Sequence, residues 1–405
     1  FGPFARPDGE FGVSFDGSTT GYISVPTDTD FDLTNATTLE FWVFIPEDQT
    51  DALVLGRHGK YWFGADYDAE GGANKFIWII SPDGSNFSNI ESSANIVYNQ
   101  WYFVQLIYSG TTATFYLDGV SQGTITSFTP QTGLSKPFYV GGYGDQLNSN
   151  SIVSNVRFSN VARSTSVPTA PFAIDSNTKL LLCSSNRFTD RSSQAAVVTP
   201  YAGAAVSAFG PFLTDEVYDP AVNGASAYFD GTNASLLINS PPSSFGTSNF
   251  TIEAWVNTGI STGGKQILGQ GPGNSTTVSN VGISGDKLQL QVYTQSGGNV
   301  LLLNGTAGEI PPNSWNHVAI THQYTNSSSS TYKMWINGVL TATFNHTGGY
   351  NWNTGAGSGN PIGINNYRYN STIGGEEYLQ DVRLVVGSLV YTSNFTPPTA
   401  PLTAI

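Results

Sequence analysis

The chain contains the same landmarks twice, in the same order. The tetrapeptide Phe-Gly-Pro-Phe stands at residues 1–4 and again at 209–212. Six further pairs match between the two halves: 15–17 with 229–231, Trp42 with Trp255, 99–101 with 313–315, 115–120 with 333–339, 154–158 with 380–384, and 167–171 with 397–401. A repeat of this length makes each copy one structural unit, so the chain must build the same fold twice.

Each copy reads as short strands joined by turns. The run Phe250–Val256 places an apolar residue at every second position, which is strand periodicity. The dipeptides Asp118-Gly119 and Asn337-Gly338 sit between β-forming residues and suit a type I′ hairpin turn. The chain has 45 Gly and 21 Pro and shows no sustained helical spacing of apolar residues. The sequence therefore predicts an all-β protein with one sandwich or jelly roll per copy.

The boundary between the two domains is open to two interpretations. Segments 180–183 and 195–199 look like strands, and 189–193 looks like a turn between them. They either open the second domain or close the first. We expect the first, with domains at 1–175 and 176–405, because a similar block would begin where residues 402–405 stand. On that interpretation the opening strands of the first domain lie upstream of residue 1.

Charge and composition exclude several functions. The net charge of −14, with only 15 Lys and Arg, argues against nucleic-acid binding. The single cysteine, Cys183, cannot form an internal disulfide. No apolar run is long enough to span a membrane.

The landmarks together resemble a known superfamily. Phe-Asp-Gly, Phe-Thr-Ile-Glu-Ala-Trp-Val, Asn-Ser-Trp-Asn-His-Val-Ala and Trp-Ile-Asn-Gly-Val follow one another in the second copy. In this order they resemble the laminin-G-like (concanavalin A-like lectin/glucanase) jelly-roll superfamily. The closing stretch 381–402 is similar to the ends of jelly-roll modules in structural proteins of tailed bacteriophages, cyanophages among them.

The resemblance implies a virion structural protein. It would form part of a fibre, a tail or baseplate appendage, or the capsid surface, as a homo-oligomer in contact with other virion subunits and with host surface glycans. The alternative is a bacterial extracellular lectin or adhesin array at the cell surface. An enzyme, or its carbohydrate-binding accessory, is a third class.

The residue pattern argues against catalysis. A retaining glycosidase needs two carboxylates about 5 Å apart. The strands that correspond to the catalytic strand of related glucanases carry one glutamate each, Glu40 and Glu253. The adjacent pair Glu376-Glu377 would face opposite ways on a strand. We therefore expect no enzyme, and we expect His317 to be structural.

No cofactor is required by the sequence, and Ca²⁺ is the one metal that its relatives suggest. Loop Asp, Asn and Glu oxygens are the ligands that Ca²⁺ prefers. The candidates are Asp145, Asn148 and Asn150 in copy one, and Asn365, Asn366, Glu376 and Glu377 in copy two. Turn-forming residues explain the same positions, and no Asp-x-Asp-x-Asp-Gly loop occurs.

Carbohydrate binding is the ligand function that the loops favour, because sugars stack on exposed aromatic rings. Copy two has the longer, aromatic-rich loops, and copy one only a thinner counterpart at Tyr143. The candidate glycan-binding residues are Tyr350, Trp352, Asn365, Tyr367, Tyr369 and Tyr143. The alternative is that these rings pack under neighbouring loops or against another subunit. The strand tryptophans at 42, 101, 255 and 315 are expected in the core.

Overall fold

The computed structural model describes most of the chain and divides it into two domains. The described residues are 2–34, 36–47, 49, 52–66, 74–133, 136–143, 148–212, 219–232, 234–239, 248–259, 264–270, 277–294, 299–326, 329–347, 361–366 and 375–405. The first domain is Arg6–Glu216. The second is Val217–Ile405 together with Phe1–Ala5. The all-β prediction is confirmed in both.

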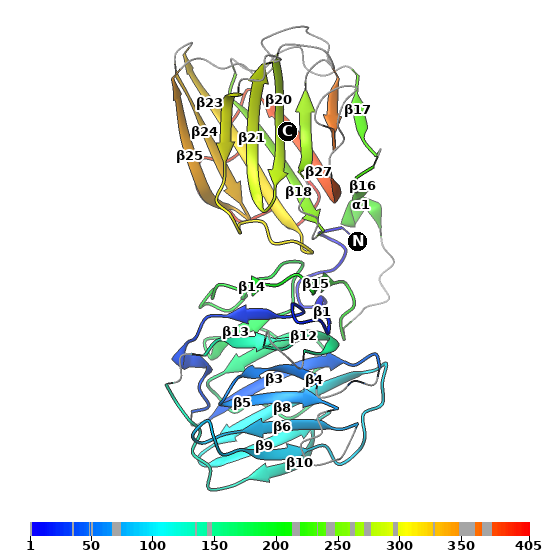
Figure 1. Ribbon diagram of the computed structural model, residues 1–405, viewed down its shortest axis with the longest axis vertical. Helices are drawn as coiled ribbons and strands as arrows, with labels where there is room; N and C mark the ends of the chain where they lie inside the picture. Colours follow the sequence, from blue (N-terminus) through cyan, green and yellow to red (C-terminus); the bar gives the residue numbers. More distant parts are fainter. Residues whose placement is uncertain are drawn as a thin grey trace. The chain divides into compact units, whose positions relative to one another are not determined.

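The first domain is a sandwich of two antiparallel sheets (Figure 1). The strands of one sheet are β1 (Gly12–Asp16), β3 (Thr37–Phe44), β8 (Trp101–Ser109), β9 (Thr112–Leu117), β10 (Val120–Ile125), β12 (Asn150–Ser159), β13 (Thr178–Leu182) and β15 (Ala204–Ser207). Its order is β10-β9-β8-β3-β12-β1-β15, and β13 also pairs with β12.

The facing sheet of the first domain has seven strands. They are β2 (Ile23–Val25), β4 (Ala52–Arg57), β5 (Tyr61–Ala65), β6 (Phe76–Ile80), β7 (Ser88–Glu91), β11 (Phe138–Val140) and β14 (Thr199–Pro200). Its order is β14-β2-β11-β4-β5-β6-β7. A short 3₁₀ helix, η1 (Thr29–Phe31), follows β2.

The second domain repeats this plan with two six-stranded sheets. Its strands are β16 (Ala227–Asp230), β17 (Leu236–Ile238), β18 (Phe250–Thr258), β19 (Lys265–Gln270), β20 (Thr277–Ser284), β21 (Lys287–Thr294), β22 (Asn299–Asn304), β23 (Asn316–Asn326), β24 (Ser329–Ile336), β25 (Val339–Thr347), β26 (Ile362–Ile364) and β27 (Glu376–Val386). The orders are β16-β27-β18-β23-β24-β25 and β17-β26-β19-β20-β21-β22. One helical turn, α1 (Pro220–Asn223), precedes β16.

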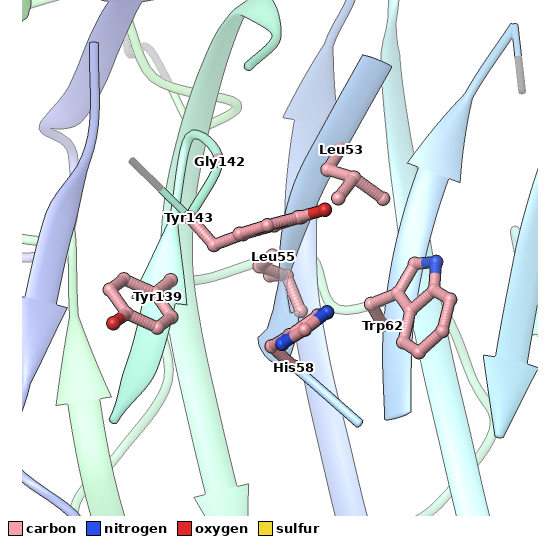
Figure 2. A pocket seen from close by; sticks show the side chains of 8 residues that line it. Leu53, Leu55, His58, Trp62, Tyr139, Gly142 and Tyr143 are labelled. Carbon is pink, nitrogen blue, oxygen red and sulfur yellow. The ribbon is translucent and has the colours of Figure 1, made fainter. Parts of the chain in front are cut away.

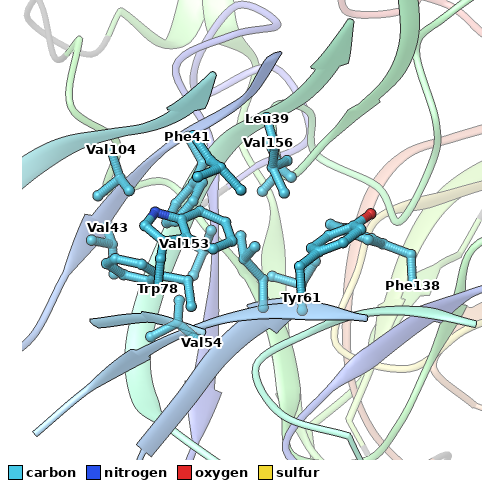
Figure 3. Packing of buried hydrophobic residues seen from close by; sticks show 14 of the residues in the cluster. Leu39, Phe41, Val43, Val54, Tyr61, Trp78, Val104, Phe138, Val153 and Val156 are labelled. Atoms are coloured by element: carbon cyan, nitrogen blue, oxygen red, sulfur yellow. The ribbon is translucent and has the colours of Figure 1, made fainter. Parts of the chain in front are cut away.

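Strand alternation explains how each sandwich encloses its own core. On β3 the side chains of Leu39, Phe41 and Val43 face the opposite sheet, where they meet residues such as Trp78 (Figure 3). On β18 the corresponding positions, from Phe250 to Val256, enter a separate core. Burial of these alternating side chains is the main favourable term in the stability of each domain.

The repeated strand tryptophans were expected in the core, but they do not lie between the two sheets. Trp42 is buried, but it lies in a small cluster with Phe103, Phe172 and Leu181, apart from the core between the sheets. Trp255 and Trp315 are also buried, and Trp101 is half-buried. These rings face outward from their sheets, and loop segments cover them.

The predicted domain boundary is wrong, because strand pairing assigns the 180–199 block to the first domain. β13 pairs with β12, β14 with β2, and β15 with β1. The turn at 189–193 is present, and the Asp190 carboxylate accepts the backbone N–H of Leu181 at 2.9 Å. Of the expected second strand, 195–199, only Thr199 pairs in a sheet, as part of β14. We call residues 178–212 the closing segment.

The two predicted hairpins are confirmed. Asp118 and Gly119 join β9 to β10, with φ values of 48° and 76°. Asn337 and Gly338 join β24 to β25, with φ values of 50° and 81°. Two successive positive φ angles are the signature of a type I′ turn, which matches the twist of the flanking strands.

Candidate functional site

A shallow hollow lies on the outer face of the seven-stranded sheet of the first domain. In the register of neighbouring strands, Tyr139 on β11 pairs with Gly56 on β4, and Gly56 pairs with Trp62 on β5. The three residues therefore stand in a row across the sheet and face the same way. The positions on either side of Trp62, Tyr61 and Phe63, point into the core.

Gly56 makes the hollow possible. A Cβ atom at this position would lie 2.4 Å from the backbone oxygen of Tyr61 and 2.5 Å from the Cα of Trp62. Its φ of 150° also belongs to a conformation that side-chain-bearing residues seldom adopt. The missing side chain leaves a gap between the rings of Tyr139 and Trp62, and this gap is the floor of the hollow.

Two further rings stand over this floor. His58 stacks on Tyr143, with ring centroids 4.8 Å apart and an interplanar angle of 20°. His58 is exposed and Tyr143 half-buried, so the stacked pair is open to solvent. Figure 2 shows His58, Tyr143, Tyr139 and Trp62 around the hollow, with Leu53 and Leu55 beneath. The hollow is shallow and mostly apolar, with the few polar atoms of its rings at the edge.

The aromatic residues continue beyond the hollow in both directions. On one side Trp62 meets Phe87, which is 51 % exposed, with ring centroids 5.2 Å apart. On the other side Tyr139 meets Tyr22 at 5.9 Å, and Tyr22 stacks on Tyr201 at 4.0 Å. We call this set the aromatic strip: Tyr201, Tyr22, Tyr139, Tyr143, His58, Trp62 and Phe87. It crosses the strands of the sheet from β14 toward β7.

The second domain does not repeat the centre of the strip. The register of β26, β19 and β20 places Gly363, Gly269 and Asn280 where the first domain has Tyr139, Gly56 and Trp62. The two domains thus share a fold but differ in the chemistry of this face.

Most of the predicted glycan-binding residues fall outside the described part of the chain. These are Tyr350, Trp352, Tyr367 and Tyr369. Asn365 is described, and its buried amide donates to the carbonyl of Ala234 at 3.0 Å. Tyr143 lies in the hollow. The structure therefore brings one predicted residue into a site with partners that the sequence did not indicate.

The calcium candidates of copy one are not gathered at one point in the described residues. Asn148 donates to the carbonyl of Ser18, and Asn150 donates to the Glu47 carboxylate at 2.9 Å. Asp145 lies outside the described residues.

In copy two the side chains of Glu376 and Glu377 face opposite ways, as predicted: the first is exposed and the second fully buried. Asn366 is also buried. Across the described ranges of both domains, no three His, Cys, Asp or Glu side chains form a group that could hold a metal ion. Calcium binding stays a prediction.

Trp62, Tyr139 and His58 were missed by sequence reasoning for a physical reason. In Tyr61-Trp62-Phe63 every residue is aromatic, so alternation cannot tell the inner face from the outer one. Tyr139 and His58 are single residues whose role depends on strands distant in sequence. The one local signal is Gly56 within a strand pattern, which marks a close approach or a bulge.

The comparisons with known families agree with this geometry. Residues 16–166 and 230–389 match the family described as the Concanavalin A-like lectin/glucanases superfamily. The chain belongs to this superfamily. The match appears once in each domain and confirms the tandem arrangement that the repeat predicts. Among curated proteins, none matches the chain in sequence.

Several solved structures resemble this chain. Domains LG4-5 of the mouse laminin alpha1 chain share 13 % identity, with 99 % of this chain and 94 % of that chain covered and a TM-score of 0.31. The heptameric SAP-like pentraxin of Limulus polyphemus shares 14 % identity, with 40 % and 81 % covered and a TM-score of 0.31. The CBM40 of the Ruminococcus gnavus IT-sialidase, bound to alpha2,3 sialyllactose, shares 17 % identity, with 33 % and 74 % covered and a TM-score of 0.28. Similarity at this level does not bear on the ligand of this chain.

Within the concanavalin A-like sandwich, the two strand glutamates are structural. Glu40 is buried and bonded to the Arg157 guanidinium at 2.6 Å and to the Gln105 amide at 2.8 Å. Glu253 is buried and bonded to Arg383 at 2.6 Å.

The Glu253 contacts also involve His317 and Tyr391. Its second oxygen lies 3.2 Å from Nε2 of His317 and accepts the hydroxyl of Tyr391 at 2.7 Å. Burial acts to raise the pKa of Glu253, but hydrogen bonds from His317, Tyr391 and Arg383 outweigh it and hold the pKa below its ordinary value. His317 is fully buried in this contact, as expected of a structural histidine.

Proposed function

We propose that this protein binds carbohydrate, and that the aromatic strip of the first domain is the binding surface. The hollow between Tyr139 and Trp62, with the exposed His58–Tyr143 stack above it, is the observation that carries the proposal. Sugar rings present C–H faces that pack on aromatic rings, and aromatic side chains lose little rotamer entropy when they bind.

The strip suits an extended glycan of several sugar units better than a single sugar. Its rings follow one another across the sheet from Tyr201 to Phe87, so consecutive sugars can each meet a ring. The tyrosine hydroxyls and the His58 ring nitrogens supply donors and acceptors at the edge of the rings. With a net charge of −14, the protein repels polyanions. We therefore expect a neutral glycan.

A glycan array with the full chain tests the proposal. We expect binding to a neutral oligosaccharide, and a loss of about tenfold in affinity for Trp62→Ala and for Tyr143→Ala, because an aromatic stacking contact contributes about 0.5–1.5 kcal/mol beyond the area that it buries. Tyr116→Ala is the matched control, since Tyr116 is a half-buried tyrosine on a strand of the opposite sheet of the same domain.

The predicted loop residues of the second domain provide the competing outcome. If Tyr350→Ala, Trp352→Ala, Tyr367→Ala or Tyr369→Ala abolishes binding while Trp62→Ala has no effect, the glycan site lies in the second domain and the strip is not the binding surface. Binding that survives every one of these changes would contradict both assignments.

A carbohydrate-binding module of this superfamily would act outside a cell or on a particle surface. In the described part of the chain, no helix combines the length and the apolar character needed to cross a membrane. The role in a phage virion, with homo-oligomers, other virion subunits and host surface glycans as partners, stays a prediction from the similarity of residues 381–402. Mass spectrometry and symmetry analysis of purified particles would test it. The bacterial lectin or adhesin array remains the alternative.

A further inference from the structure

The closing segment completes both sheets of the first domain. β15 pairs with the outer side of β1 from Ala204 to Ser207, and β14 pairs with the outer side of β2. Leu180 and Leu182 of β13 are buried in the core, and Ala196 and Val198 pack against it. The segment therefore supplies backbone partners for two sheet edges and apolar side chains for the core.

In the described part of the chain, no strand pairs with the outer sides of β16 and β17, which form the corresponding edges of the second domain. β16 corresponds to β1 and pairs with β27 alone, and β17 corresponds to β2 and pairs with β26 alone. Leu236 and Ile238 of β17 are 54 % and 47 % exposed, whereas their counterparts Ile23 and Val25 are each 1 % exposed. An apolar edge strand with open backbone groups is a site for strand addition.

The repeated tetrapeptide shows what this site accepts. In the first domain Phe212, the last residue of the closing segment, packs edge-on against Trp42 at 5.5 Å and 81°. In the second domain Phe4 packs against Trp255, the counterpart of Trp42, at 5.6 Å and 84°. The carbonyl of Phe4 also accepts the side-chain amide of Asn223 at 2.9 Å. Phe4 thus takes the place of Phe212, although it does not follow the second domain in sequence.

The last residues of the second domain follow the same path as the residues that precede the closing segment in the first domain. In the first domain the Arg157 guanidinium donates to the carbonyl of Ala173 at 3.1 Å, just before β13. In the second domain its counterpart Arg383 donates to the carbonyl of Thr403 at 2.7 Å. The chain thus takes the same path past this arginine in both domains.

We propose that the edge formed by β16 and β17 is a docking site for a segment of the same chemistry as residues 175–212, joined behind the tail of the second domain. Its strands pair with β16 and β17, its leucines cover Leu236 and Ile238, and its terminal phenylalanine displaces Phe4 from Trp255. The edges of β16 and β17 are then covered as those of β1 and β2 are in the first domain.

The test compares three versions of the full chain. The first is the chain of 405 residues. In the second, residues 175–212 are repeated behind Ile405. In the third, that added copy carries Ala204→Pro and Val206→Pro, which remove its strand pairing. We expect amide hydrogen exchange in β16 to be at least about tenfold slower in the second version than in the other two, because pairing protects edge amides.

Phe4→Ala separates docking from a general stabilising effect. It should speed exchange around Trp255 in the chain of 405 residues, and it should have no effect in the extended chain, where the added segment supplies the phenylalanine. Equal exchange in all three versions would overturn the proposal. Protection that appears only in a dimer, as judged by light scattering, would overturn the intramolecular route.

Discussion

At the scale of single residues, the buried charged groups of the second domain are the most informative. Glu377 and Lys265 are both almost fully buried, and their charges interact. Burial raises the pKa of Glu377 to about 8, and the nearby Lys265 only partly opposes this. Burial also lowers the pKa of Lys265. Both shifts have the same origin, since a charged group is less stable away from water.

Glu377→Gln should remove a pH dependence of stability. The folded-state pKa is raised from the ordinary 4.5 to about 8. The contribution of Glu377 is therefore fully present below pH 4.5 and is lost as the pH rises toward 8. We expect the free energy of unfolding of the second domain to fall across this window in the natural chain and to stay flatter in the variant.

Urea denaturation of the full chain across that window is the measurement, with the second domain followed by amide exchange of its core strands. Glu376→Gln is the matched control, because this neighbouring carboxylate is exposed and bonded to the Tyr228 hydroxyl. The same slope in the natural chain and in Glu377→Gln would mean that Glu377 is ionised throughout.

At the scale of elements, the type I′ hairpins hold loop segments as well as strands. In the turn between β24 and β25, the backbone N–H of Phe395 donates to the carbonyl of Gly338 at 2.9 Å. Phe395 stacks on Tyr391 at 3.5 Å, and Tyr391 reaches the buried Glu253. The hairpin turn therefore supports the segment that carries Tyr391 and Phe395, whose rings lie against Trp335.

Gly338→Ala should destabilise the second domain more than a turn substitution normally does. The φ of 81° is unfavourable for alanine, and its Cβ would lie 1.8 Å from the carbonyl oxygen of Phe395. Gly285→Ala is the matched control, because its φ is 67° and nothing lies within 4 Å of the added Cβ.

We expect the control to lose about 1–2 kcal/mol in its free energy of unfolding, which is the cost of the left-handed conformation alone. The loss should be larger for Gly338→Ala, as measured by thermal unfolding. Equal losses of stability in the two variants would show that the segment around Phe395 moves away without cost.

At the scale of the whole molecule, each domain has its own hydrophobic core and its own buried charge cluster. In the first domain the Asp32 carboxylate bonds to two buried cations, Arg57 at 2.6 Å and Lys60. The Arg57 guanidinium also donates to Thr27 and to the carbonyl of Lys136. In the second domain the buried Glu253 bonds to Arg383 at 2.6 Å, as Glu40 bonds to Arg157 in the first.

Asp32→Asn should lower the temperature of one of two unfolding transitions. The substitution leaves two buried cations without their anion, and breaking a buried ion pair on one side costs about 3–5 kcal/mol. We expect differential scanning calorimetry of the full chain to show two transitions, with only that of the first domain shifted downward. A parallel shift of both would mean that the domains unfold as one unit.

The features that the sequence predicted correctly depend on short stretches of chain. The alternation of Phe250–Val256 predicts which face is buried, and Asn337-Gly338 predicts a turn with positive φ, because each follows from backbone geometry within a few residues. The repeat predicts two domains, since identical landmarks in the same order require the same fold. For the same reason the superfamily could be identified before the structure was known.

Only the tertiary structure decided which domain the closing segment completes and where the aromatic strip lies. A strand as short as Ala204–Ser207 fits several sheet edges equally well, and the pairing with β1 is decided by contacts between residues far apart in sequence. Tyr139, Gly56 and Trp62 form a hollow because three strands bring them into one register, which no local pattern records. Local geometry thus determines the elements, and long-range pairing determines the site.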